Sequence, residues 1–332
     1  SAAPERSAGA KRGVTFLQNI FTLRLEYPTC MQTIPQKIRE LVEQRELLRR
    51  QKRYKEGDEI RERIGDLGYE VEDTEKGMRV FRKSAYVTPK KSFLVLFGSG
   101  EIAPSAQKVH DRVLRGIAKD KPNVVILSTP AGFQPNVKVV CEEIKSFFER
   151  HLKNYHPRVE ILYANTLEQS NNSTNVQFLD NADYIFAGPG SPTYAVGNLR
   201  GSLLLTKITE RVRAGASVGL SSAAAIAFSR FALPVYEIYK AGFDLYWENG
   251  LDFYTEIFSQ LTVITHFNNN EGGKKNDTSR AWMGKQRFEE LFAMLPKEKK
   301  LWGIDEHTAV LINLQTKKIE TLGKGKLWQY NT

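Results

Sequence analysis

The stretch Ser217-Val218-Gly219-Leu220-Ser221-Ser222-Ala223-Ala224-Ala225 decides how the larger part of this chain folds. Its apolar start predicts a buried strand at 217–220, and the tiny side chains that follow predict a helix beginning immediately after the strand. A serine at such a tight bend needs small neighbours, and the first N–H groups of the helix point toward it. A Ser/Ala-rich helix N-cap packed closely on a sheet produces the same pattern, so both interpretations stand at this point.

On either side of this stretch, short apolar runs alternate with amphipathic segments. We expect further strands at 93–97, 123–127, 159–163, 184–187 and 261–265, two more near 309–314 and 317–322, and helices at 105–118, 138–152, 203–214 and 286–295. Continuously apolar strands that alternate with helices are typical of a parallel sheet covered on both faces. In such α/β sheets, binding sites form beyond the carboxyl ends of the strands.

Composition limits the class of protein. The chain has 332 residues, of which 41% are hydrophobic and 26% charged, enough for a sizeable core and for two domains. The formal net charge of +10 allows contact with nucleic acid or another polyanion. The two cysteines, Cys30 and Cys141, fit neither a disulfide framework nor a cysteine-ligated zinc site, so we expect a reducing, cytoplasmic setting. No apolar run is long enough to predict a membrane span.

Three regions follow from the change in character along the chain. Residues 1–33 are expected to be a lead-in, with no apolar core of a secretory signal. Residues 34–84 carry two amphipathic stripes and predict a helical hairpin, in which Gly68 ends the second helix and a short extended piece follows. Residues 85–91 are expected to be a linker to the α/β domain at 92–332.

Candidate reactive groups gather at predicted strand ends. The glycines Gly188 and Gly190 follow the strand at 184–187, and His266 follows the strand at 261–265. The acids Asp305 and Glu306 offer a carboxylate that could orient an imidazole base. A metal site using His266, both acids and His307 is the alternative, but their spacing matches no zinc motif, so we expect neither a metal nor a cofactor.

Residues 92–330 resemble the dipeptidase E and cyanophycinase group of serine peptidases, within the class I glutamine amidotransferase-like superfamily. The matching text is Gly98-Ser99-Gly100-Glu101, Ala187-Gly188-Pro189-Gly190, Gly219-Leu220-Ser221-Ser222-Ala223-Ala224, Thr265-His266-Phe267 and Gly303-Ile304-Asp305-Glu306-His307-Thr308-Ala309. The elbow of that group is usually Gly-Thr-Ser-Ala-Gly-Ala, from which Leu220, Ser222 and Ala223 depart. The resemblance implies a flavodoxin-like three-layer sandwich with a mostly parallel sheet.

The resemblance also implies roles for single residues. Ser221 would be the nucleophile and His266 the base, with Glu306 as third member ahead of Asp305. The N–H of Ser222 and the loop of Gly188 and Gly190 would bind the oxyanion. Arg280 could pair with a substrate carboxylate as a bidentate fork, although an ordinary surface arginine is the alternative.

Residues 36–83 resemble the small C-terminal domain of cysteinyl-tRNA synthetases. The matching text is Arg45, Lys52, Asp58-Glu59-Ile60-Arg61, Leu67-Gly68-Tyr69-Glu70-Val71 and Glu72-Asp73-Thr74-Glu75-Lys76-Gly77. In the synthetases this module helps to hold the tRNA, so the resemblance implies binding of tRNA or another RNA. The rest of a synthetase is absent from this sequence, and no aminoacylation is expected.

The sequence therefore predicts a serine hydrolase that cleaves a small peptide or isopeptide amide. An inactive scaffold that binds tRNA or ribosomes through residues 36–83 is the alternative, and a metal-dependent amidohydrolase is the third. No membrane partner is expected, and a homodimer is kept open.

Overall fold

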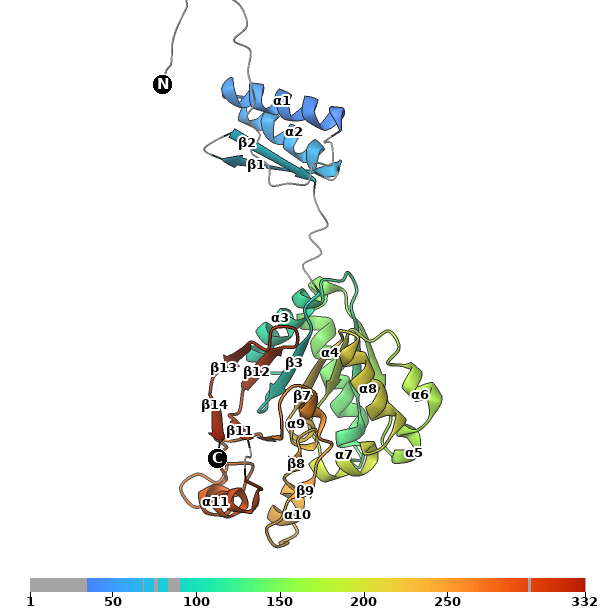
Figure 1. Ribbon diagram of the computed structural model, residues 1–332, viewed down its shortest axis with the longest axis vertical. Helices are drawn as coiled ribbons and strands as arrows, with labels where there is room; N and C mark the ends of the chain where they lie inside the picture. The colour runs from blue at the N-terminus through green and yellow to red at the C-terminus, as the bar shows by residue number, and fades with distance from the viewer. Residues whose placement is uncertain (1–34, 68, 75–76, 83–89, 298–299, 332) are drawn as a thin grey trace, which may run out of the picture. The chain divides into compact units, whose positions relative to one another are not determined.

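The computed structural model describes residues 35–67, 69–74, 77–82, 90–297 and 300–331 (Figure 1). The chain divides into two compact units, Ser1–Tyr86 and Val87–Thr332, which are described separately. The expected lead-in at 1–33, with Cys30, and positions 85–89 of the expected linker lie outside the described residues. Within the described part, no helix has the length and apolarity needed to cross a membrane.

The smaller unit is a helical hairpin followed by a two-stranded antiparallel ribbon. Its elements are α1 (Gln36–Arg50), α2 (Tyr54–Asp66), β1 (Tyr69–Thr74) and β2 (Gly77–Arg82). The predicted apolar stripes form its core, to which Ile38, Leu41, Ile60 and Ile64 belong. The fully buried guanidinium of Arg45 donates two hydrogen bonds, 2.8 and 3.0 Å long, to the Asp73 carboxylate and so joins α1 to β1.

The larger unit is built on a seven-stranded sheet. The strand order is β13 (Ile319–Gly323), β12 (Thr308–Asn313), β3 (Phe93–Phe97), β7 (Ser217–Ser221), β6 (Tyr184–Ala187), β4 (Asn123–Leu127) and β5 (Arg158–Leu162). The last five of these strands run parallel, whereas β12 is antiparallel to β3 and β13 is antiparallel to β12. The inner strands β3 and β6 are continuously apolar and all residues of β3, β6 and β7 are buried, because both faces of the sheet are covered.

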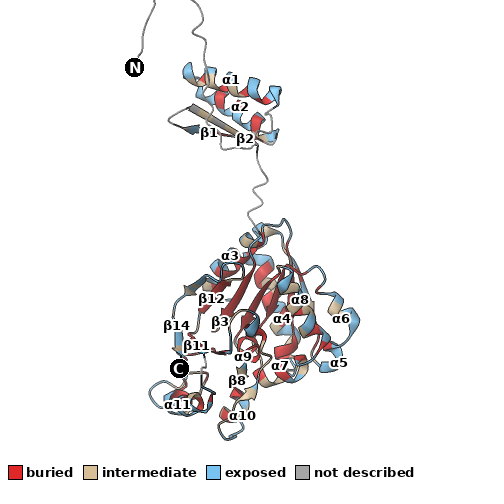
Figure 2. Cartoon of the chain, viewed as in Figure 1, coloured by how far each residue is buried: buried red, intermediate tan, exposed pale blue. Residues whose placement is uncertain are grey.

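Helices cover the two faces, and alternate strand residues divide between two cores (Figures 1 and 2). One face packs against α3 (Gln107–Ile117) and α4 (Val137–His151); the other packs against α7 (Pro192–Leu199), α8 (Leu203–Arg213) and α9 (Ala223–Ala227). On β3, for example, Phe93, Val95 and Phe97 face the first core, and Leu94 and Leu96 face the second. The predicted three-layer α/β sandwich with an additional helical hairpin is confirmed.

The strand expected at 261–265 lies in a second sheet and not in the main one. There β10 (Leu261–Ile264) pairs in parallel with β11 (Lys300–Ile304), which pairs antiparallel with β14 (Leu327–Asn331). The sequence analysis did not predict β11 or β14. β11 follows the predicted helix at 286–295 and completes a strand-helix-strand unit with β10, whereas β14 follows β13 with no helix between them. The remaining elements are α5 (Leu167–Ser170), α6 (Ser173–Gln177), α10 (Val235–Tyr239), α11 (Gly284–Met294), the short pair β8 (Phe231–Ala232) and β9 (Glu248–Asn249), and 3-10 turns at Pro104–Ala106, Thr129–Ala131, Lys153–Tyr155 and Phe253–Glu256.

Candidate active site

The bend after β7 has the backbone geometry of a nucleophile elbow, and Ser222 stands at its apex. The strand continues through Ser221, one residue further than predicted, and α9 begins at Ala223. Between them Ser222 has φ 51° and ψ −115°, a left-handed conformation that costs a non-glycine residue about 1–3 kcal/mol. The residues of α9 are all buried, which explains why the sequence there uses such small side chains.

A chain of hydrogen bonds runs from this serine through a histidine to an acid. The Ser222 hydroxyl lies 2.9 Å from His266 Nε2, and His266 Nδ1 lies 2.8 Å from Glu306 Oε1. His266 follows β10 and Glu306 follows β11, and these two strands are parallel neighbours, so their carboxyl ends meet. The backbone N–H of His266 donates a 3.1 Å hydrogen bond to the carbonyl of Gly98, which follows β3. This bond connects the second sheet to the first beside the elbow.

The prediction that Ser221 meets His266 is wrong. Ser221 is fully buried, and its hydroxyl donates to Glu101 Oε2 at 2.8 Å. As the last residue of β7, it shares a face with Gly219, whose position is closed in by the rings of Tyr184 and Phe186. Side chains on a strand point alternately to opposite faces, so this register directs Ser221 down into the α3–α4 core. The positive φ of Ser222 turns its own side chain to the other side, where the cavity opens.

The prediction for the oxyanion donors is corrected in part. The Ser222 N–H donates to the Phe97 carbonyl at 3.1 Å and is therefore occupied. The next N–H, that of Ala223, opens α9, where the first amides have no partner within the helix. Gly190 lines the adjacent cavity; Gly188 is not among the described residues that do so. A Cβ at Gly190 would lie 1.9 Å from the Pro130 carbonyl oxygen, so only glycine allows this close approach.

Of the two candidate acids, Glu306 meets His266, and the second choice, Asp305, is wrong for this role. Asp305 is buried, and its carboxylate accepts hydrogen bonds of 2.9 Å from the Lys326 N–H and from the Trp328 indole. It therefore joins β11 to β14. The Asp305 side chain points toward β14, and the side chain of the next residue, Glu306, points toward His266 at the end of β10.

Arg280, which was expected to pair with a substrate carboxylate, packs against two aromatic rings. Its guanidinium lies over the rings of Phe267 and Phe288, 5.2 and 5.7 Å from their centroids. It is not among the described residues that line the cavity next to Ser222. The side chain serves packing of the loop that follows His266.

The electrostatics of the site favour a histidine that can accept a proton from Ser222. The hydrogen bond from His266 lowers the pKa of Glu306, and Asn269 Nδ2 donates to the same oxygen at 2.9 Å. An ionised Glu306 can only accept, so His266 Nδ1 carries the proton of that bond; in the neutral form of the ring, Nε2 then presents its lone pair to the Ser222 hydroxyl.

Below the elbow lies a second polar group of residues, which we call the lower cluster: Ser221, Glu101, His110 and Tyr184. His110 lies on α3 and is buried, with Nε2 2.9 Å from the Glu101 carbonyl oxygen and Nδ1 3.2 Å from the Tyr184 hydroxyl. Burial lowers the pKa of His110 to about 4. The imidazole is neutral at pH 7 and holds the loop after β3 against α3.

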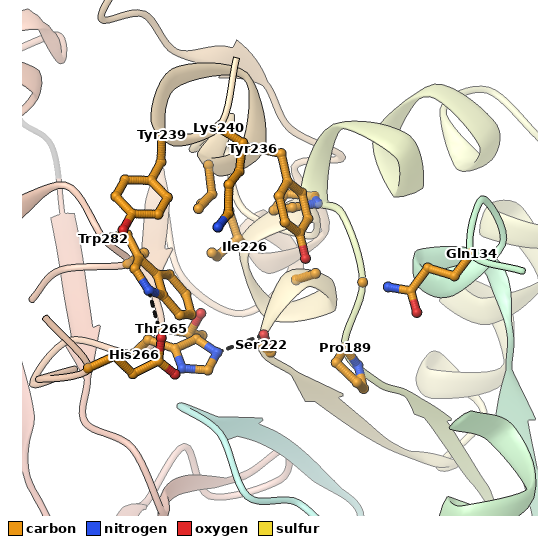
Figure 3. A pocket seen from close by; sticks show the side chains of 16 residues that line it. Gln134, Pro189, Ser222, Ile226, Tyr236, Tyr239, Lys240, Thr265, His266 and Trp282 are labelled. Atoms are coloured by element: carbon orange, nitrogen blue, oxygen red, sulfur yellow. Dashed lines mark hydrogen bonds between the residues drawn. The ribbon is translucent and has the colours of Figure 1, made fainter. Parts of the chain in front are cut away.

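A cavity of about 420 Å³ opens above Ser222 (Figure 3). Glu271 lines it, together with large polar and aromatic side chains that the sequence analysis did not identify, among them Gln134, Tyr236, Tyr239, Lys240 and Trp282. Most of these residues come from loops or from the ends of short helices, where no periodic pattern marks them. In the part of the chain that the structure describes, no group of three or more His, Cys, Asp or Glu residues is placed to hold a metal ion.

Comparisons with known proteins identify the fold of the chain and a short sequence likeness. No family model matches the sequence. A peptidase from an acI-B1 Actinobacterium has a similar structure, with a TM-score of 0.58, 22% identity, and coverage of 73% of this chain and 94% of that one. A protein from Listeria monocytogenes EGD-e that carries the name peptidase E aligns with a TM-score of 0.48 and 16% identity over 71% of this chain and all of the other. The larger unit thus shares its fold with a peptidase.

The sequence likeness concerns a different class of protein. Cysteine–tRNA ligases of Chlamydia caviae and Chlamydia abortus are 40% and 45% identical to this chain over 47 residues. These residues are 14% of this chain and 10% of each ligase. The chain therefore spans about a tenth of the length of the curated relatives it matches.

Proposed function

We propose that the larger unit is a serine hydrolase of the dipeptidase E and cyanophycinase type, with Ser222 as nucleophile, His266 as general base and Glu306 as the acid that orients the histidine. The observation that carries the proposal is the backbone of Ser222, held at positive φ with its hydroxyl 2.9 Å from His266 Nε2. Nucleophilic acyl transfer requires a serine that is hydrogen-bonded to a histidine, which in turn is hydrogen-bonded to an acid, and a strained backbone at the serine is typical of such sites. The fold shared with a peptidase supports the same class of reaction.

The proposed reaction proceeds in two steps. His266 takes the proton of Ser222 as its oxygen bonds to an amide carbonyl carbon, and the Ala223 N–H and the backbone of the Gly190 loop bind the oxyanion. The carbon–nitrogen bond then breaks, His266 gives its proton to the leaving amine, and an acyl ester of Ser222 remains. In the second step water, deprotonated by His266, hydrolyses that ester and restores the serine.

A small peptide or an isopeptide is the substrate class that we propose. The cavity of about 420 Å³ is large enough for only a few amino-acid residues. Its wall mixes aromatic rings with the opposite charges of Lys240 and Glu271, a lining suited to a short zwitterionic ligand.

The test is covalent labelling with a fluorophosphonate, which reacts with activated serines. The labelled chain is digested, and the adduct is located by peptide mass spectrometry. An adduct on Ser222 supports the proposal. An adduct on Ser221, or a native chain that fails to react under conditions that label an ordinary serine hydrolase, contradicts it.

A second function, RNA binding by the smaller unit, is proposed from its charge and from the ligase likeness. The end of α1, the turn after it and the start of α2 together carry Arg49, Arg50, Lys52, Arg53 and Lys55, and Tyr54 beside them is 54% exposed. Clustered cations with an exposed aromatic ring suit a phosphate backbone and its bases. The full chain should bind tRNA with an affinity that falls steeply with salt, and Lys52→Glu with Lys55→Glu should weaken binding about tenfold or more. The matched control is Lys317→Glu with Lys318→Glu in the larger unit; equal binding by all three chains would contradict the proposal.

A further inference from the structure

Trp282 forms one wall of the cavity and packs directly against the proposed base. Its ring centroid lies 4.9 Å from that of His266, with an angle of 46° between the planes, and Tyr239 lies beyond it at 6.4 Å (Figure 3). The indole N–H is held by Glu271 Oε2 at 3.0 Å. Both edges of the ring system are thereby fixed, and the indole contributes to the cavity lining.

The backbone that presents Trp282 is held in an unfavourable conformation. Arg280, Ala281 and Trp282 are three consecutive non-glycine residues with positive φ, at 57°, 55° and 65°. Two backbone hydrogen bonds hold this turn against the proposed base, His266. The Arg280 N–H donates to the Phe267 carbonyl at 2.9 Å, and the Ala281 N–H donates to the His266 carbonyl at 3.3 Å. Such strain persists only where the surroundings over-determine it, and it is concentrated at binding and catalytic sites.

The chemistry of the proposed reaction decides which part of a substrate meets this wall. His266 delivers its proton to the departing nitrogen, so the leaving amine must lie on the His266 side of Ser222. The oxyanion lies on the side of Ala223 and Gly190. Figure 3 shows Trp282 beside His266 with Tyr239 beyond it, whereas Pro189 and Gln134 lie on the other side of Ser222. Trp282 therefore faces the leaving group.

We infer that Trp282, backed by Tyr239, is the specificity-determining surface for the leaving residue and selects short peptides whose leaving amino acid carries an apolar or planar side chain. The inference rests on the proposed serine hydrolase function. Aromatic walls favour flat and apolar groups through burial and stacking. Among the described residues that line the cavity, the only carboxylate is that of Glu271, and it already accepts the indole N–H. The ammonium of Lys240 lies over the Tyr239 ring at 5.1 Å.

The experiment uses the full chain and dipeptide mixtures of the form Xaa-Phe, Xaa-Leu, Xaa-Gly, Xaa-Arg and Xaa-Glu, with all amino acids equally represented at the first position. Release of the second amino acid is measured by mass spectrometry, and fluorophosphonate labelling of Ser222 is measured on the same preparations. The wild-type chain should release Phe and Leu about tenfold faster than Gly, and faster than Arg or Glu. Trp282→Ala should reduce these ratios to within about threefold while Ser222 is still labelled.

A second variant and a control guard against a general loss of structure. Trp282→Phe, which keeps a ring against His266, should retain the order of preference with a smaller Phe to Gly ratio. Phe243→Ala, an exposed aromatic outside the cavity lining, should leave every ratio unchanged. Wild-type ratios in either Trp282 variant, or labelling of Ser222 without release of an amino acid from any mixture, would overturn the inference. Failure of Ser222 to react with the phosphonate would instead overturn the proposed function.

Discussion

Ser221 and Ser222 are neighbours in the chain but belong to two different regions of the molecule. Ser221 lies in the lower cluster, fully buried, with its hydroxyl on Glu101. Ser222 opens into the cavity, with its hydroxyl on His266 and an acid behind the histidine. Each region contains a serine, a histidine and a glutamate. The lower cluster is closed to solvent and the upper one is open, so residue types alone do not separate a supporting group from a reactive one.

The largest difference should appear when Ser222 is changed. Ser222→Ala removes the hydroxyl that His266 activates, so the rate of fluorophosphonate labelling should fall by about 10³-fold or more. The thermal midpoint should stay close to that of the wild type, because the alanine replaces a partly open side chain. Labelling of the Ser222→Ala chain at the wild-type rate would show that Ser222 is not the reactive serine.

The acids of the open region should come next. Glu306→Gln keeps the shape but removes the charge that stabilises His266 as it gains a proton, so labelling should slow by about 10²–10⁴-fold. Asp305→Asn, one residue away, should leave the labelling rate within about threefold and instead lower the unfolding free energy by about 1–3 kcal/mol, because it disturbs buried acceptors. Rates measured beside urea unfolding curves separate the two acids, and the reverse pattern would exchange their roles.

The lower cluster should be visible in the pH dependence of stability. The pKa of His110 is lowered from 6.5 to about 4 in the folded chain. Between these two pH values the unfolded chain binds more protons than the folded one. The contribution of the neutral His110 to the free energy of unfolding is therefore fully present above pH 6.5 and is lost as the pH falls toward 4. The loss amounts to about 3 kcal/mol. Urea unfolding between pH 7 and pH 4 should show this slope in the wild type and a flatter one in His110→Phe; parallel slopes would argue against a neutral His110.

The smallest effect concerns the other serine. Ser221→Ala leaves the buried Glu101 carboxylate without this donor, so the unfolding free energy should fall by about 1–2 kcal/mol, while labelling of Ser222 continues. The coupling between Ser221→Ala and Glu101→Gln, measured as a double-mutant cycle, checks that the contact itself is responsible. Strictly additive effects would mean that the hydrogen bond contributes nothing.

Much of the fold could be predicted because buried strands of the main sheet appear in the sequence as continuous apolar runs. The strands β3, β4 and β6 are continuously apolar, and their bounds agree with the expected ranges. The second sheet was missed because its strands β10, β11 and β14 pair across long stretches of chain, and a local pattern does not show which strands pair with one another. The cavity wall was missed for a related reason: Tyr236, Lys240 and Trp282 are ordinary residues on irregular segments until the chain folds.

Of the hydrogen-bonded Ser222, His266 and Glu306, the sequence analysis proposed the histidine as base and Glu306 as acid, but it chose Ser221 as the serine. His266 follows a strand that the sequence predicts, whereas Glu306 follows the unpredicted β11 and was proposed from the family resemblance. Whether Ser221 or Ser222 stands at the bend depends on where β7 stops, and sequence patterns locate element ends only within a few residues.

The sequence alone determined that this chain has an α/β unit and a helical hairpin, and that a serine and a histidine lie at the ends of predicted strands. These features depend on local periodicity and composition. Only the tertiary structure decided which serine faces the histidine, which acid orients it, and what lines the cavity. Those outcomes depend on a single-residue shift in register, on one positive φ, and on contacts between segments far apart in the chain, which no local pattern records.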